Sequence, residues 1–120
     1  MTTILAIEDE TPILENILET IELGGYDAKG APNGRLGVDL ARQHRPDLIV
    51  CDILMPELDG YGVLLELRND PATATIPFIF LTAKASRDDM RQGMGLGADD
   101  YISKPFTPDE LLAAVNARLE

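Results

Sequence analysis

Short apolar runs alternate five times with segments of helical period along this chain, and this alternation limits the possible folds more than any other feature. Two of the runs, near residues 48–52 and 76–81, are continuously apolar instead of alternating with polar residues. Strands of this kind are buried on both faces, as in a parallel sheet that helices cover on each side. The sequence therefore predicts a doubly wound α/β fold with a five-stranded parallel sheet and five helices.

Residues that favour helix starts and ends locate several of these elements. Thr11 and Pro12 predict the N-cap and the first-turn proline of the first helix. Two further helices fit residues 34–44 and 60–69. A weak strand near residues 26–31 is expected at one edge of the sheet.

The last helix has the clearest start. Thr107 and Glu110 form the pattern of a capping box, and Phe106 and Leu111 stand where a hydrophobic staple would lie. A fourth helix is predicted near residues 86–94, where a short apolar stripe follows another capping-box pattern.

Length and charge exclude several classes of protein. The 120 residues suit one domain spanning 1–120, and no apolar run approaches the roughly 20 residues of a membrane span. A net charge of −11 disfavours direct binding to nucleic acid, because such a surface repels phosphate backbones. The single cysteine excludes an internal disulfide, and the N-terminus lacks the basic region of a secretory signal. We expect a cytoplasmic protein that does not associate with a membrane.

Four of the apolar runs end on residues that can take part in chemistry: Glu8-Asp9, Asp52, Thr82 and Lys104. The carboxyl ends of parallel strands meet at one edge of a sheet, and ligands of doubly wound folds bind there. We therefore expect three carboxylates, a hydroxyl and an ammonium group to share one pocket.

This set of groups suits a divalent cation and a phosphoryl group. Several carboxylates in one pocket repel one another, and Mg²⁺, which prefers oxygen ligands, relieves that repulsion. A carboxylate can attack phosphorus and become an acyl phosphate. An ammonium and a hydroxyl would neutralise and bind the phosphoryl oxygens, because phosphoryl transfer depends mainly on positioning and charge neutralisation.

The motifs at these strand ends resemble one known family. Asp52 is followed by Met55-Pro56 and Asp59-Gly60, and the chain also has Thr82-Ala83 and Lys104-Pro105 in the expected order. The whole chain closely resembles the CheY-like receiver domain of two-component response regulators. The resemblance implies a flavodoxin-like sheet with the strand order 2-1-3-4-5.

The resemblance also implies a role for each residue. Asp52 matches the phosphorylated aspartate, and Asp9 and Asp52 match the side-chain ligands of Mg²⁺. The other matches are Glu8 holding a metal-bound water, the backbone carbonyl of Leu54 as a metal ligand, Thr82 and Lys104 binding the phosphoryl group, and a cis peptide bond between Lys104 and Pro105.

The resemblance further implies a signalling switch and its partners. Phosphorylation on Asp52 by a histidine kinase or phosphotransfer protein would move Thr82 and turn Tyr101 inward. The face of the fourth helix, fifth strand and fifth helix would then change its affinity for an effector, or for a second copy of the chain. The protein would be a phosphoacceptor and not an enzyme, apart from slow loss of its own phosphoryl group, which the apolar Leu54 is expected to slow.

Other interpretations remain at this stage. Glu8 and Asp9 alone could be ordinary acids before a helix, and Tyr101 could serve core packing only. A phosphatase with a phosphoaspartate intermediate usually has a second aspartate where this chain has Leu54. A flavin carrier would not place acids after its first strand, because they repel phosphate. A binding module that has lost phosphorylation is the remaining alternative.

Overall fold

The structure is a computed structural model, and it describes residues 1–83, 95 and 97–119. Five parallel strands form one sheet in the order β2-β1-β3-β4-β5, which confirms the predicted sheet. The strands are β1 (Thr3–Ile7), β2 (Asp27–Ala31), β3 (Leu48–Asp52), β4 (Phe78–Thr82) and β5 (Asp100–Ser103). The weak strand β2 lies at an edge, as predicted.

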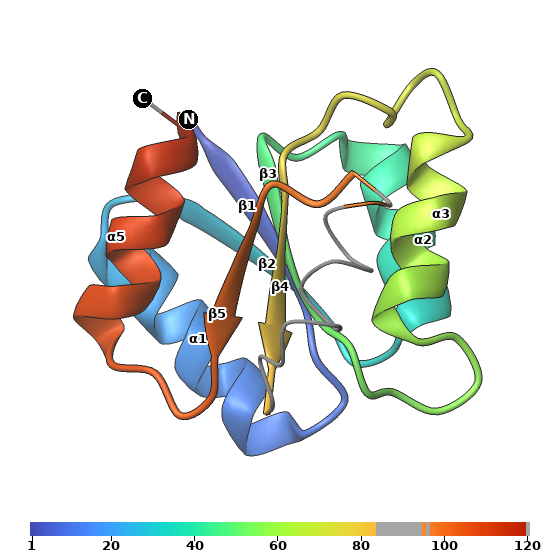
Figure 1. The fold of residues 1–120 in the computed structure, drawn as a ribbon. Coiled ribbons are helices and arrows are strands. Elements are labelled where there is room, and N and C mark those ends of the chain that lie inside the picture. The colour runs from blue at the N-terminus through green and yellow to red at the C-terminus, as the bar shows by residue number, and fades with distance from the viewer. Residues whose placement is uncertain (84–94, 96, 120) are drawn as a thin grey trace.

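Helices cover both faces of the sheet. The helices within the described residues are α1 (Thr11–Leu23), α2 (Gly34–His44), α3 (Gly60–Arg68) and α5 (Pro108–Leu119). α1 and α5 lie on one face, and α2 and α3 lie on the other (Figure 1). The predicted fourth helix, near residues 86–94, falls outside the described residues.

Successive residues of the central strands enter two separate cores. In β1, Leu5 and Ile7 belong to the core under α2 and α3, whereas Ile4 and Ala6 belong to the core under α1 and α5. Every residue of β3 and β4 is buried. The continuous apolar runs therefore reflect burial on both faces, as the sequence predicts.

The helix starts agree with the sequence in one case and differ in another. The capping box of α5 is present: the Glu110 backbone N–H donates to Thr107 Oγ1 at 3.1 Å, and the Thr107 N–H donates to Glu110 Oε1 at 3.2 Å. The prediction of Thr11 as the N-cap of α1 is wrong. Glu10 takes that position, because its carbonyl already accepts the Leu14 N–H at 2.9 Å, and Thr11 is the first helical residue.

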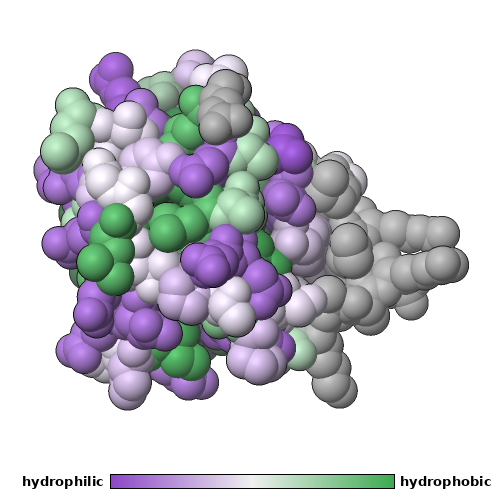
Figure 2. Space-filling model, turned by 90° about the vertical axis from the view of Figure 1, so that its left-hand side faces the viewer, coloured by the Kyte–Doolittle hydropathy of each residue, from purple (hydrophilic) through white to green (hydrophobic). Residues whose placement is uncertain are grey.

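The face of the molecule that carries α1 and α5 is mixed in polarity. On the face of α1 and α5, hydrophobic side chains gather near the middle of the view among hydrophilic ones (Figure 2). Within the described part of the chain, no helix has both the length and the apolar character to cross a membrane.

Because all five strands run in the same direction, their carboxyl ends form one edge, at the bottom of Figure 1.

Candidate functional site

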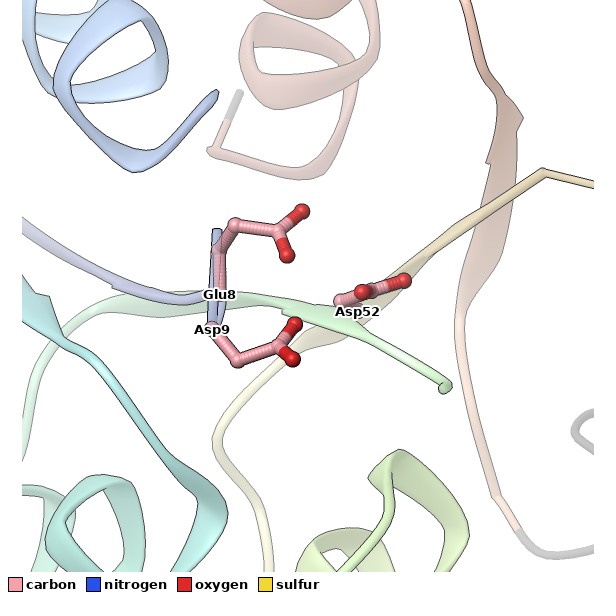
Figure 3. Close-up of side chains that lie close together, drawn as sticks. All are labelled: Glu8, Asp9 and Asp52. Carbon is pink, nitrogen blue, oxygen red and sulfur yellow. The ribbon is translucent and has the colours of Figure 1, made fainter. Parts of the chain in front are cut away.

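Three carboxylates meet at this edge of the sheet. Glu8 and Asp9 directly follow β1, and Asp52 is the last residue of the neighbouring strand β3. One carboxylate oxygen of each residue lies within 4.8 Å of the others, and Figure 3 shows the three side chains converging. Glu8 is fully buried and Asp52 is 6% exposed. The sheet thus brings together three acids that lie up to 44 positions apart in the sequence, from Glu8 to Asp52.

Lys104 joins this cluster from the loop after β5. Its ammonium donates a hydrogen bond to Glu8 and lies 3.4 Å from Asp52 Oδ1. Its backbone N–H donates to the carbonyl of Thr82 at 2.8 Å, and the Lys104–Pro105 peptide bond is cis, as the resemblance implies. The sequence predicts that Lys104 and Glu8, 96 positions apart, share one pocket, but it does not predict the hydrogen bond between them.

Burial and charge shift the pKa values of this pair. Burial raises the pKa of Glu8 to about 7; the hydrogen bond from Lys104 opposes this rise, and Asp52 adds to it. Burial alone would lower the pKa of Lys104, but the hydrogen bond to Glu8 and the charge of Asp52 raise it overall. The ammonium of Lys104 therefore only partly offsets the effects of burial and of Asp52 on Glu8.

The donor set fits a hard divalent cation. Carboxylate oxygens at this spacing are ligands that Mg²⁺ accepts, and Mg²⁺ usually takes one or two carboxylates together with waters. The pKa of Glu8 is raised mainly by burial and further by the neighbouring Asp52, so a bound cation would favour the charged form of Glu8.

The other predicted site residues belong to β4, to β5 and to the segment after β3. Thr82 ends β4 and is 5% exposed, and Leu54, after β3, is 74% exposed. Tyr101 in β5 is half-buried, and its ring centroid lies 5.3 Å from that of Phe80 at an interplanar angle of 48°. Phe80 is its cross-strand partner in the register of β4 and β5, a contact that requires the strand order and not only the sequence pattern.

A pocket of about 390 Å³ opens beside Lys104. Its walls come from the start of α1, the end of β4 and the loop before α5: Ile13, Asn16, Ala83, Lys104, Pro105 and Phe106. The pocket is mainly apolar and adjoins the acidic cluster through Lys104.

Comparison with known proteins agrees with this geometry. The family model described as "Response regulator receiver domain" matches residues 4–116. The DNA-binding dual master transcriptional regulator RpaA of Synechocystis is 44% identical over 119 residues, which cover 99% of this chain and 49% of RpaA. The phosphate regulon transcriptional regulatory protein PhoB of Pseudomonas aeruginosa is 42% identical over 117 residues, 98% of this chain and 51% of PhoB. The chain thus spans about half the length of these relatives.

Solved structures show the same fold. The chemotaxis protein CheY4 of Vibrio cholerae superposes with a TM-score of 0.95 at 28% identity, covering 99% of both chains. The receiver domain of a sensor histidine kinase from Pseudomonas aeruginosa, solved with magnesium in its active-site cleft, has a TM-score of 0.88 at 31% identity, covering 98% of this chain and 97% of that one. The chain therefore belongs to the family of response regulator receiver domains, which act in two-component signal transduction.

Proposed function

We propose that this chain is a phosphorylation-dependent switch that accepts a phosphoryl group on Asp52. The observation that carries the proposal is the meeting of Glu8, Asp9, Asp52 and Lys104 at the carboxyl edge of the sheet. This arrangement supplies a nucleophile, a set of metal ligands and a cation at one place.

Each residue has a proposed part in the transfer. An oxygen of Asp52 attacks the phosphorus of a phosphohistidine; a P–O bond forms, and the P–N bond of the donor breaks. Lys104, already 3.4 Å from Asp52, neutralises the phosphoryl oxygens, and the Thr82 hydroxyl donates a hydrogen bond to one of them.

Mg²⁺ is the proposed cofactor. Asp9, Asp52 and the Leu54 carbonyl would hold it directly, and Glu8 would hold it through a water. Its positive charge would reduce repulsion between the carboxylates and the incoming phosphoryl group.

The proposed donor is a histidine kinase or a phosphotransfer protein in the cytoplasm. The apolar pocket supports this, because Lys104 is one of its lining residues and lies 3.4 Å from Asp52, so a protein docked there would be close to the acceptor. We propose a separate protein effector, or a second copy of the phosphorylated chain, as the downstream partner. The charge of −11 argues against direct contact with nucleic acid.

Tyr101 and Thr82 are the proposed switch residues. Tyr101 packs on Phe80, which lies two residues before Thr82 in the same strand, so a movement of Thr82 toward a phosphoryl group would change the surroundings of the tyrosine ring. NMR spectra with and without a phosphoryl mimic should differ for Tyr101 and for residues 86–94. Identical spectra would contradict the proposed switch.

The phosphorylation itself is tested with acetyl phosphate and Mg²⁺. We expect the chain to gain the mass of one phosphoryl group, mapped to Asp52, and we expect Asp52→Asn to abolish the gain. Asp39→Asn, which changes an exposed acid on α2, is the matched control and should be phosphorylated like the wild type. Undiminished mass gain in Asp52→Asn would show that the acceptor is misassigned. Repeated turnover of phosphate esters would instead favour a hydrolase.

A further inference from the structure

The loop between β3 and α3, residues 53–59, follows the proposed acceptor and contains Leu54. A hydrogen bond closes the loop at its base: the Gly60 N–H donates to the carbonyl of Ile53 at 2.9 Å. A Cβ atom on Gly60 would lie 2.4 Å from the carbonyl oxygen of Asp52, so Gly60 allows α3 to begin directly against the end of β3. This contact fixes the base of the loop.

The far part of the loop contains a tight turn with an unfavourable backbone angle. The Leu58 N–H donates to the carbonyl of Pro56 at 2.8 Å, which is the hydrogen bond of a γ-turn. Glu57, the central residue, has a φ of 69° although it is not glycine. A residue keeps such a conformation only when its surroundings hold it there.

The start of α2 packs against this turn. A Cβ atom on Gly34, the first residue of α2, would lie 2.4 Å from the carbonyl oxygen of Leu58, closer than real Cβ atoms approach any backbone atom. The same atom would lie 3.0 Å from Val63 Cγ2, so it could not move aside toward α3. Only glycine lets α2 touch the backbone of the turn.

We propose that Gly34 is a positioning residue for the metal site. Its contact with Leu58 holds the turn at residues 56–58, and Gly60 holds the base, so the segment with the Leu54 carbonyl is fixed from both sides. The inference rests on the proposed function, in which that carbonyl binds Mg²⁺. It adds a residue of α2, 20 positions before Leu54, to the groups that determine Mg²⁺ affinity.

The test compares three variants with the wild type. Gly34→Ala pushes on the backbone of Leu58. In Gly62→Ala the new Cβ would instead meet Leu58 Cδ1 at 2.6 Å, the end of a side chain that can rotate away. Asn33→Ala removes the side-chain cap of α2, the 2.8 Å hydrogen bond from Leu36 N–H, without adding bulk. It therefore controls for simple destabilisation of the helix start.

Two quantities are measured for each variant: the dissociation constant of Mg²⁺ by calorimetry, and the amide NMR shifts of residues 53–59 without metal. We expect Gly34→Ala to weaken Mg²⁺ binding about tenfold or more, as loss of support around metal ligands typically does. The amide shifts of the loop should move in the same variant. Gly62→Ala and Asn33→Ala should keep wild-type affinity and loop shifts.

The outcomes separate this inference from the proposed function. Wild-type affinity in folded Gly34→Ala, or equal weakening in Asn33→Ala, would overturn the positioning role. If Gly34→Ala does not fold, Leu58→Ala loosens the same turn from the other side; weaker binding there supports the inference, and wild-type affinity overturns it. Failure of the wild type itself to bind Mg²⁺ would overturn the proposed function together with any role of Gly34 toward the metal.

Discussion

At Glu8, burial and the hydrogen bond from Lys104 act on the pKa in opposite directions. Glu8 is fully buried, it accepts a hydrogen bond from Lys104, and its pKa is raised to about 7. Between its ordinary pKa of 4.5 and about 7, the folded protein therefore retains a proton that the unfolded chain releases. Without metal, the free energy of unfolding should fall as the pH rises through this range.

The variant Glu8→Gln should remove this component of the pH dependence, because the amide does not titrate. Urea unfolding followed by circular dichroism, in metal-free buffer at several pH values, measures the effect. Glu19→Gln, at an exposed position of α1, should keep the wild-type pH profile. Parallel profiles for wild type and Glu8→Gln would contradict the prediction.

Leu54 affects the expected lifetime of the acyl phosphate. The residue is 74% exposed and lies two positions after Asp52, so its apolar side chain is expected beside the proposed path of the hydrolytic water. We expect Leu54→Asn to lose its phosphoryl group faster, because an amide can hydrogen-bond that water, whereas Leu54→Met should resemble the wild type. The measurement is the rate at which the phosphorylated chain loses the mass of the phosphoryl group after acetyl phosphate is removed. An unchanged rate in Leu54→Asn would be evidence against this role of Leu54.

Among the elements, α5 begins with a reciprocal pair of capping hydrogen bonds between Thr107 and Glu110. Thr107→Ala removes the hydroxyl that accepts the Glu110 N–H, and the loss of such a cap costs about 0.5–2 kcal/mol of stability. The midpoint of urea unfolding should fall accordingly, and Thr107→Ser, which keeps the hydroxyl, should restore most of the loss. A midpoint that does not change in Thr107→Ala would mean that packing alone holds the start of α5.

The starts of α5 and α1 show which features of a helix start can be predicted from neighbouring residues alone. The capping box of Thr107 and Glu110 is predictable because both partners lie within one helical turn. Thr11 carries a similar signal, yet Glu10 takes the cap position of α1, because the route of the chain out of β1 decides which residue is first in the helix. A local pattern predicts that a helix begins, and the tertiary path decides at which residue.

For the whole molecule, the excess of negative charge means that added cations should stabilise the folded state. Stabilisation specific to Mg²⁺ would indicate binding at the acidic cluster. Mg²⁺ that binds only the folded state should stabilise it by about 2.7 kcal/mol at a concentration 100 times its dissociation constant. Simple screening of the charge of −11 also stabilises the protein, so NaCl at equal ionic strength is the control.

Thermal unfolding should therefore show a larger stabilisation by MgCl₂ than by NaCl in the wild type. Asp9→Asn should lose that difference, because it removes one of the three clustered carboxylates. An equal response of Asp9→Asn and the wild type would place the cation elsewhere on the surface.

The sequence by itself determined the layered α/β fold and the edge where the site lies. Continuous apolar runs require burial on both faces, and parallel strands bring their polar ends, such as Asp52 and Lys104, to one edge. Only the tertiary structure decided which groups touch there. The Lys104–Glu8 hydrogen bond and the contact of Gly34 with Leu58 depend on how strands and helices pack across the sheet, and no spacing along the chain encodes distances of a few ångströms between distant residues.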